Sequence, residues 1–238
     1  MPDFDVRNPS ARDRLIVPLD VPTVDDARAV VKDLGDSVSF YKVGFQILYG
    51  GGFDLVSELK DQGKQIFIDL KLLDIDNTVK SGVESLKRLG GTFLTIHAYP
   101  HAMRAAVDAR GDDDLKLLGV TVMTNLDDER LQEAGYKDKA GSLVIKRASQ
   151  ANQIGMDGVI CSAAEASAIR ATVGPDLLLV TPGIRPANAS ADDQRRIMTP
   201  KLAIENGSDY LVIGRPILNA DNRRAAADTI VAEIEAAL

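Results

Sequence analysis

The segment FIDLKLLDIDNT, residues 67–78, gathers charged side chains directly after a short apolar run. Asp69, Lys71, Asp74 and Asp76 all fall within eight residues. An amine flanked by carboxylates is a fixed cation, which can donate a proton or stabilise negative charge that develops on a substrate. We therefore take this segment as the first candidate for a catalytic site.

The apolar run before these residues predicts a strand, along which side chains alternate between two faces. Asp69 and Lys71 then share one face, while Ile68 and Leu70 occupy the other. A half-exposed strand followed by a capped helix would give the same pattern. The apolar flanks favour a functional site, because an exposed face rarely needs such a buried strand.

The segment VIGRPI, residues 212–217, fits a phosphate-binding turn. Gly214 lets backbone amides approach an anion, and Arg215 supplies a charged fork. Barrels of alternating strands and helices often bind phosphate after their last two strands. A tight turn with a solvated arginine is the alternative that this segment leaves open.

A long polar stretch, TPGIRPANASADDQRRIMTP at residues 181–200, joins a predicted strand to a predicted helix. Most such connections have about 2 to 6 residues, and a loop of this length in a compact enzyme is often a lid. An insertion whose Arg195 and Arg196 are merely solvated remains the alternative.

Histidine and cysteine, which often do chemistry, are scarce in this chain. His97 and His101 are four residues apart, but Pro100 lies between them and no third ligand is evident, so we expect no metal site. Cys161 lies inside an apolar strand and is expected to be an inert core residue. A single cysteine also excludes internal disulfides.

The composition limits the kinds of partner. The chain has 238 residues, a formal charge of -7 and a pI near 4.9, so it offers no broad basic surface for nucleic acid or anionic lipid. A phosphorylated small molecule would have to be held by a few local groups. The polar start lacks the apolar core of a signal peptide, and no apolar run is long enough to span a membrane. We expect a cytoplasmic protein that binds neither nucleic acid nor membrane.

The elements that must position the candidate site follow from an alternation of short apolar runs with amphipathic stretches. The predicted strands cover residues 14–20, 39–44, 65–71, 93–98, 115–122, 157–162, 177–183 and 210–214. Between the first two, the residues that recur at helical spacing before a closing Gly35 are Ala27, Val30, Val31 and Leu34.

Eight such units predict a (β/α)₈ TIM barrel of the α/β class, since no G-x-G-x-x-G fingerprint of an open sheet follows the first strand. We expect a single domain over residues 1–238, with a short polar N-terminal tail at residues 1–13. In a barrel, chemistry gathers at the carboxyl ends of the strands. The candidate segments above all fall at such ends.

The motifs DLKLLDIDNT, TPGIRP, DQRRIMTP and VIGRPI, with Asp20 in PLDV and Lys42 in YKVG, closely resemble the orotidine 5'-monophosphate decarboxylase family. The resemblance extends over residues 15–217 and lies in the joint order and spacing of these motifs. It implies a homodimeric barrel that converts orotidine monophosphate to uridine monophosphate and carbon dioxide. No metal or organic cofactor would take part in this last step of pyrimidine nucleotide synthesis.

Carried over position by position, the resemblance implies the catalytic roles. Lys71 would donate a proton to carbon 6 of the pyrimidine, and Asp69 would lie beside the substrate carboxylate. An alternating charged array would be formed by Lys42, Asp69, Lys71 and Asp74. Asp74 and Thr78 would reach into the active site of the partner subunit, so that the homodimer shares its sites.

The resemblance also implies the residues that bind substrate. Asp20 and Lys42 would hold ribose hydroxyls, and Thr124 would contact the pyrimidine side. The phosphate and the lid would be held by Arg185, Gln194, Gly214 and Arg215, and Pro182 is counted with these substrate-binding residues.

One turn departs from the family pattern. After the fourth strand, HAYPHAM carries Tyr99 and Pro100 where the family commonly has glycines. The sequence leaves the shape of this turn open, although the expected chemistry does not depend on it.

The physical reason for a charged array is the charge that decarboxylation leaves behind. Loss of carbon dioxide from a pyrimidine carbon leaves an electron pair that ring resonance does not relieve, so a cation must already be in place. General acid catalysis supplies about 10² to 10⁴ in rate, roughly 3 to 5 kcal/mol, whereas enzymes supply about 8 to 23 kcal/mol. A preorganised field and the binding of phosphate and ribose must therefore supply the remainder.

Two other functions remain open at this stage. Keto-gulonate phosphate decarboxylase and hexulose phosphate synthase resemble the D-x-K-x-x-D core but use magnesium, with an acidic group near the position of Lys42. A lysine there argues against a metal. The other alternative is a phosphate-binding module that has lost catalysis, and the intact Lys71 with its carboxylates argues against it.

Overall fold

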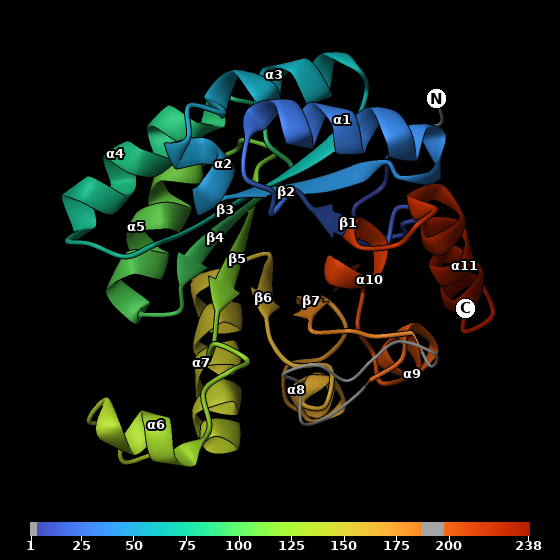
Figure 1. Ribbon diagram of the computed structural model, residues 1–238. Coiled ribbons are helices and arrows are strands. Elements are labelled where there is room, and N and C mark those ends of the chain that lie inside the picture. Colours follow the sequence, from blue (N-terminus) through green and yellow to red (C-terminus); the bar gives the residue numbers. More distant parts are fainter. Residues whose placement is uncertain (1–3, 187–197) are drawn as a thin grey trace.

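The computed structural model describes residues 4–186 and 198–238, and in this part of the chain parallel strands close into a barrel (Figure 1). Each strand pairs with the next, and the first pairs with the last. The strands are β1 (Leu15–Pro18), β2 (Phe40–Gly44), β3 (Gln65–Leu72), β4 (Phe93–His97), β5 (Lys116–Val120), β6 (Gly158–Ile160), β7 (Leu178–Pro182) and β8 (Tyr210–Val212). The predicted (β/α)₈ barrel is confirmed, with every strand where the sequence places it.

Helices surround the barrel and connect successive strands (Figure 1). They are α1 (Val24–Leu34), α2 (Phe45–Tyr49), α3 (Phe53–Asp61), α4 (Asp76–Lys87), α5 (Pro100–Arg110), α6 (Asp128–Glu133), α7 (Ala140–Ile154), α8 (Ala166–Val173), α9 (Pro200–Glu205), α10 (Arg215–Leu218) and α11 (Arg223–Glu235), with a 3₁₀ turn at Gly35–Ser37. None of the helices in the described residues is both long and apolar enough to cross a membrane.

Helix α1 illustrates how local sequence sets these elements. The Thr23 hydroxyl accepts the N–H of Asp26 at 3.1 Å and so caps the first turn. The four apolar residues predicted to share a face are all buried. Gly35 follows with φ 54°, a left-handed conformation that glycine adopts without steric cost, and the helix ends there.

The apolar core has two parts, one inside the barrel and one between the strands and the helices. Along β3, Phe67 lies in the inner cluster, whereas Ile66 and Ile68 lie in the outer one. This alternation is the one that the sequence predicts, and it leaves Asp69 and Lys71 on the inner face at the carboxyl end.

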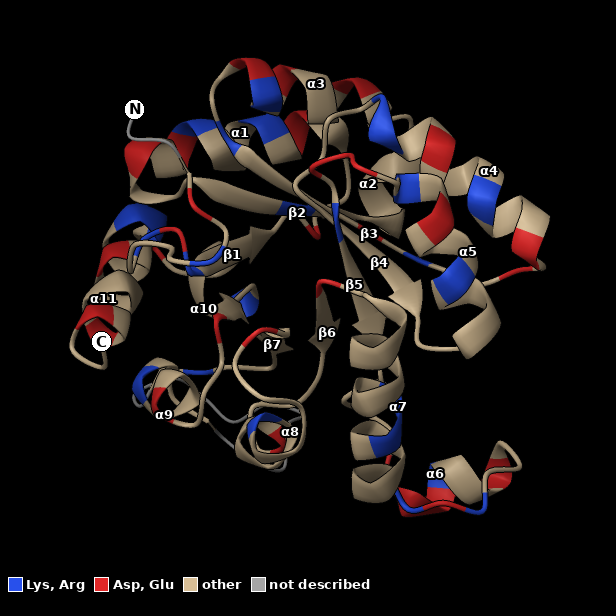
Figure 2. Ribbon diagram, turned by 180° about the vertical axis from the view of Figure 1, so that it is seen from behind, with Lys and Arg blue, Asp and Glu red and all other residues tan. Residues whose placement is uncertain are grey.

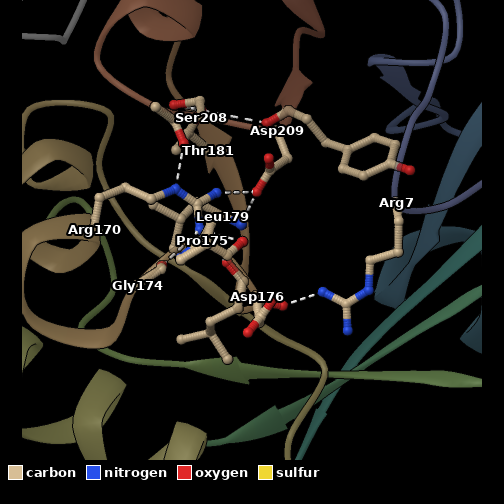
Figure 3. Close-up of polar contacts among 12 residues, drawn as sticks. Arg7, Arg170, Gly174, Pro175, Asp176, Leu179, Thr181, Ser208 and Asp209 are labelled. Atoms are coloured by element: carbon tan, nitrogen blue, oxygen red, sulfur yellow. Dashed lines mark hydrogen bonds and ion pairs between the residues drawn. The ribbon is translucent and has the colours of Figure 1, made fainter.

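The tail before β1 closes the amino-terminal end of the barrel. Phe4 packs edge-on against Phe40, the first residue of β2, with ring centroids 5.7 Å apart. The Tyr210 hydroxyl donates to the carbonyl of Val6 at 2.9 Å, and Arg7 donates to the carbonyl of Asp176 (Figure 3). We predicted a polar tail from the sequence, but two of its apolar side chains, Phe4 and Val6, pack against the inner cluster.

Partly buried ion pairs stabilise the same end of the barrel. Asp209, just before β8, accepts the N–H of Leu179 in β7 at 2.7 Å and pairs with Arg170 of α8 (Figure 3). Arg170 also donates to the carbonyl of Gly207 at 3.1 Å. Asp157 repeats this arrangement before β6. Each carboxylate thus ties two strands and a helix together, away from the carboxyl ends of the strands.

Charges of both signs are interspersed along the outer helices (Figure 2). The net charge of -7 is therefore spread over the surface. Buried charged groups are few by comparison, and three of them, Lys42, Asp69 and Arg185, lie near the carboxyl ends of the strands.

Candidate active site

A pocket of about 310 Å³ opens at the carboxyl ends of the strands. It is lined by Pro18, Asp20, Lys42, Phe67, Asp69, Lys71, Ile160, Pro182, Gly183, Arg185, Val212, Gly214 and Arg215. These residues come from β1, β2, β3, β6, β7 and β8 and from the turns that follow them. Most of the residues that the sequence predicts for the site are thus brought together from positions far apart in the chain.

Four of the lining residues form one ion-pair network, in which positive and negative side chains alternate. Lys42 Nζ lies 3.3 Å from Asp20 Oδ1 and 3.2 Å from Asp69 Oδ2, and Lys71 Nζ lies 2.7 Å from Asp69 Oδ1. The side chains of Lys42 and Asp69 are each only 11% exposed. Such a buried pair is costly to desolvate, and it persists because each charge is paired within hydrogen-bonding distance.

Asp69 lies at the centre of this ion-pair network, and its environment favours the ionised form of its carboxyl group. Burial alone would raise the pKa of Asp69, but the charges of Lys42 and Lys71 and hydrogen bonds from Lys71 and Thr95 outweigh it. The pKa of Asp69 therefore lies below its ordinary value. The group stays ionised at neutral pH and holds both ammonium groups in place.

Lys71 is placed by an irregularity in β3. Ile68 pairs with Leu94 and Leu72 pairs with Ile96, so β3 uses two more residues than β4 over this stretch. Lys71 lies in the excess and has φ 46°, the one positive φ of a non-glycine residue in the described chain. Because the excess is an even number of residues, Leu72 faces the same side as Ile68, and Lys71 lines the pocket.

The opposite wall of the pocket carries the predicted phosphate residues. Gly214 lies in the turn between β8 and α10, and a Cβ there would lie 2.8 Å from the Pro18 ring, so only glycine fits this close approach. Arg215 begins α10 directly afterwards, and the side chain of Arg185 is nearly fully buried beside the pocket. The backbone N–H of Arg185 donates to the carbonyl of Met198 at 3.1 Å. Two arginines therefore line the wall that faces the ion-pair network.

Other predicted residues lie outside this pocket. In the described structure Asp74 and Thr78 are exposed around the start of α4, and Thr124 is exposed in the turn after β5. The Asp74 carboxylate accepts the N–H of Ile75 at 2.7 Å. Gln194 lies outside the described residues, as does most of the predicted lid, so the structure does not place them.

Three residues near the ion-pair network were not predicted for the site. A Cβ at Gly44 would lie 3.3 Å from Lys42 Nζ, so this glycine leaves room at the strand end. The ring of Phe45 lies 5.6 Å from Lys71 Nζ, in the range of a cation–π contact. Thr95 donates to Asp69. Gly44 and Phe45 follow Lys42 in the sequence and could have been found there, but Thr95 resembles any strand residue.

The turn left open after β4 is shaped by an aromatic and arginine cluster. Tyr99 occupies the residue position before α5, and its hydroxyl is hydrogen-bonded to that of Tyr136. The Arg147 guanidinium, on α7, lies 5.0 Å from the Tyr99 ring and 5.4 Å from the Tyr136 ring, and it donates to the carbonyl of Thr121. Through Arg147, Tyr99 is therefore connected to Thr121, the residue that follows β5.

His97 ends β4 close to this cluster. Burial lowers the pKa of His97, and the positive charges of Lys71 and Arg147 lower it further. Its ring contacts that of Tyr99 edge-on at 6.4 Å. In the described residues, no group of three or more His, Cys, Asp or Glu side chains is arranged to hold a metal ion.

A larger hollow, of about 500 Å³, lies between α5 and α7 on the outside of the barrel. It is lined by Pro100, Arg104, Val107, Asp108, Gln150, Gln153 and Ile154. No strand end reaches it, and it has no buried charge, so we assign the site to the smaller pocket at the strand ends.

The fold and the site define a class of protein, a (β/α)₈-barrel enzyme with a charged centre at the carboxyl ends of its strands. The model of the orotidine 5'-phosphate decarboxylase / HUMPS family matches residues 13–230. The chain therefore belongs to that family.

Individual relatives agree with this assignment. The chain is 58% identical over 227 residues to the orotidine 5'-phosphate decarboxylase of Rhodopseudomonas palustris strain BisB5, covering 95% of this chain and 97% of that protein. It is 57% identical to the protein of the same name from strain HaA2. The crystal structure of orotidine 5'-phosphate decarboxylase from Lactobacillus acidophilus superposes with a TM-score of 0.83 at 38% identity, over 93% of this chain and 99% of that one.

Proposed function

We propose that the chain decarboxylates orotidine 5'-monophosphate to uridine 5'-monophosphate and carbon dioxide, in pyrimidine biosynthesis. The relatives named above support this activity, because the identity extends over nearly the whole chain. The observation that supports the mechanism is the ion-pair network in one pocket, formed by Asp20, Lys42, Asp69 and Lys71.

Lys71 is the proton donor in this proposal. The bond between carbon 6 and the substrate carboxylate breaks, its electron pair stays on carbon 6, and the Lys71 ammonium supplies the proton that replaces carbon dioxide. A cation held 2.7 Å from Asp69 is preorganised for this charge, so little reorganisation is needed during the reaction. The Asp69 carboxylate would lie beside the carboxylate that leaves, and Lys42 keeps Asp69 fixed from the other side.

The phosphate of the substrate binds at the opposite wall, at Gly214, Arg215 and Arg185. A guanidinium can bind a phosphate through two parallel N–H donors. Asp20 and Lys42 would hold the ribose hydroxyls, and Pro182 lines the same pocket. By resemblance, Gln194 and the loop around it close over the phosphate, and Thr124 contacts the pyrimidine.

A second copy of the chain completes the array. Within its own chain the Asp74 carboxylate accepts the N–H of Ile75, and Asp74 is absent from the lining of the pocket that contains Lys71. The neighbouring apolar side chains of Leu73 and Ile75 are 45% and 70% exposed. A partner subunit that buries them would bring Asp74, with Thr78 one helical turn later, to the other pocket. The result is a homodimer with shared active sites.

The reaction needs no metal or organic cofactor in this proposal. The magnesium-dependent relatives have an acidic group near the position of Lys42. In this chain the lysine is paired with Asp20 and Asp69. A cation already occupies the position between these carboxylates.

An assay of the purified protein tests the proposed function. Release of carbon dioxide and uridine monophosphate from orotidine monophosphate should proceed equally with and without a chelator. Turnover that disappears with the chelator would favour a metal-dependent relative. Absence of turnover under both conditions would favour a binding module that has lost catalysis.

A further inference from the structure

The hydroxyl group of Thr95 links the two central residues of the site. Thr95 lies on β4, where its side chain is fully buried. Its hydroxyl oxygen accepts the backbone N–H of Lys71 at 3.0 Å, and its O–H donates to Asp69 Oδ1 at 2.9 Å. The same Oδ1 atom lies 2.7 Å from Lys71 Nζ.

The need for this hydroxyl follows from the irregularity in β3. Where β3 gains two residues relative to β4, backbone groups leave the regular ladder between these strands. A buried N–H without a partner is costly, and the Thr95 hydroxyl accepts the one from Lys71. Lys71 is thereby held at φ 46°, a conformation that residues with a side chain rarely adopt.

The second hydrogen bond acts on the carboxylate. Asp69 has Lys71 at one oxygen and Lys42 at the other, and a carboxylate placed between two flexible lysines could rotate about its χ2 angle. Because its hydroxyl is engaged with the Lys71 backbone, Thr95 donates to Oδ1 from a fixed direction. The carboxylate, the lysine backbone and the lysine ammonium are thus held by one side chain.

We propose that Thr95 is a positioning residue for the decarboxylation, which sets the orientation of Asp69 and the backbone of Lys71 without contacting the substrate. This inference rests on the proposed function, because it assigns Thr95 to the array that carries out that reaction. Thr95 is absent from the lining of the pocket, to which Asp69 and Lys71 belong.

The chain offers a matched control at the other end of the same two strands. Thr92, just before β4, accepts the N–H of Ile66 at 3.2 Å and donates to Gln65 Oε1 at 2.7 Å. It therefore makes the same two kinds of hydrogen bond to β3, but at the amino-terminal end of the barrel. A general effect of losing a threonine hydroxyl from this strand pair should appear at both positions.

The experiment compares kcat, KM for orotidine monophosphate, the affinity for uridine monophosphate and thermal unfolding in Thr95→Val, Thr95→Ser and Thr92→Val. Misplacing a catalytic group by about 1 Å can cost about 10²-fold in rate. We expect Thr95→Val to lower kcat by about tenfold or more, while KM and product affinity change by less than about threefold. Thr95→Ser should stay within about threefold of the parent kcat, and Thr92→Val within about twofold.

Several results would overturn the inference. A Thr95→Val enzyme with kcat within about threefold of the parent would do so, as would an equal loss in Thr92→Val. If Thr95→Val does not fold, the comparison of Thr95→Ala with Thr95→Ser isolates the hydroxyl, and equal kcat values for these two would overturn it. A parent protein without turnover would instead overturn the proposed function, and the role of Thr95 would fall with it.

Discussion

Mixing two inactive variants tests whether the active site is shared between subunits. Lys71→Ala removes the proton donor, and Asp74→Ala removes the carboxylate that we assign to the neighbouring site. Neither change touches the core, since Lys71 lines the pocket and Asp74 is exposed. Each variant alone should therefore fold and be inactive, and Lys71→Ala turnover within tenfold of the parent would refute the role of Lys71.

The size of the recovery follows from the geometry of the site. If Lys71 and Asp74 of one site come from different chains, each hybrid dimer has one site with both lesions and one site with neither. Half of an equal mixture is hybrid when subunits assort freely, so activity should rise to about one quarter of the parent value. If Asp74 instead serves its own chain, every site keeps a lesion.

The assay follows orotidine monophosphate turnover after subunit exchange. Exchange is confirmed with two different affinity tags, by recovering dimers that carry both. A mixture of parent with the doubly substituted chain is the matched control, because its hybrid has one lesion in each site and should add no activity. With exchange confirmed, activity no higher than that of the separate variants would refute the shared site.

Three further predictions concern the phosphate wall, the tail and the central carboxylate. Arg215→Ala should weaken binding of uridine monophosphate by about 10- to 100-fold in calorimetry and leave uridine unchanged, since a hydrogen bond to a charged group contributes about 1.5–3 kcal/mol; an equal loss for both ligands would refute the assignment. Phe4→Ala should lower the free energy of unfolding by about 2 kcal/mol, roughly half the value for a fully buried Phe, because Phe4 is half-buried against Phe40; the exposed Phe53→Ala is the control, and equal unfolding midpoints for the two variants would contradict the packing role. The lowered pKa of Asp69 should stabilise the folded state above the ordinary aspartate pKa of about 3.9 and lose this effect as pH falls through the lower folded value. The stability advantage of the parent over Asp69→Asn should then be constant from about pH 8 to 5 and shrink below about pH 4, and an advantage that grows on acidification would count against the ion pairs as its source.

The barrel could be predicted from the sequence because its signals are local. The apolar runs of β1 to β8 and the apolar face of α1 each lie within a dozen residues, and periods of 2 and 3.6 are visible at that range. The same locality placed Asp69 and Lys71 on one face of β3. Since parallel strands in a barrel end at one rim, predicting the strands also brought Asp20, Lys42 and Arg215 into one pocket.

Not every predicted site residue lies in the pocket at the strand ends. Asp74 and Thr78 follow β3 closely in the sequence, yet they lie outside the pocket of their own chain. Only the resemblance to a family suggested that they serve a partner. A local pattern gives the position of a residue along a strand or helix, but it does not give the surface that will cover an exposed carboxylate.

The tertiary structure alone decided how the charged residues are held. Thr95 lies in β4 and resembles any β-branched strand residue, and its role arises only because β3 carries two extra residues beside it. Arg147 likewise lies far along the chain from Tyr99, whose ring it contacts. Strand positions follow from short-range periodicity, whereas the exact register between strands and the partner of a buried polar group depend on long-range packing, which no local pattern records.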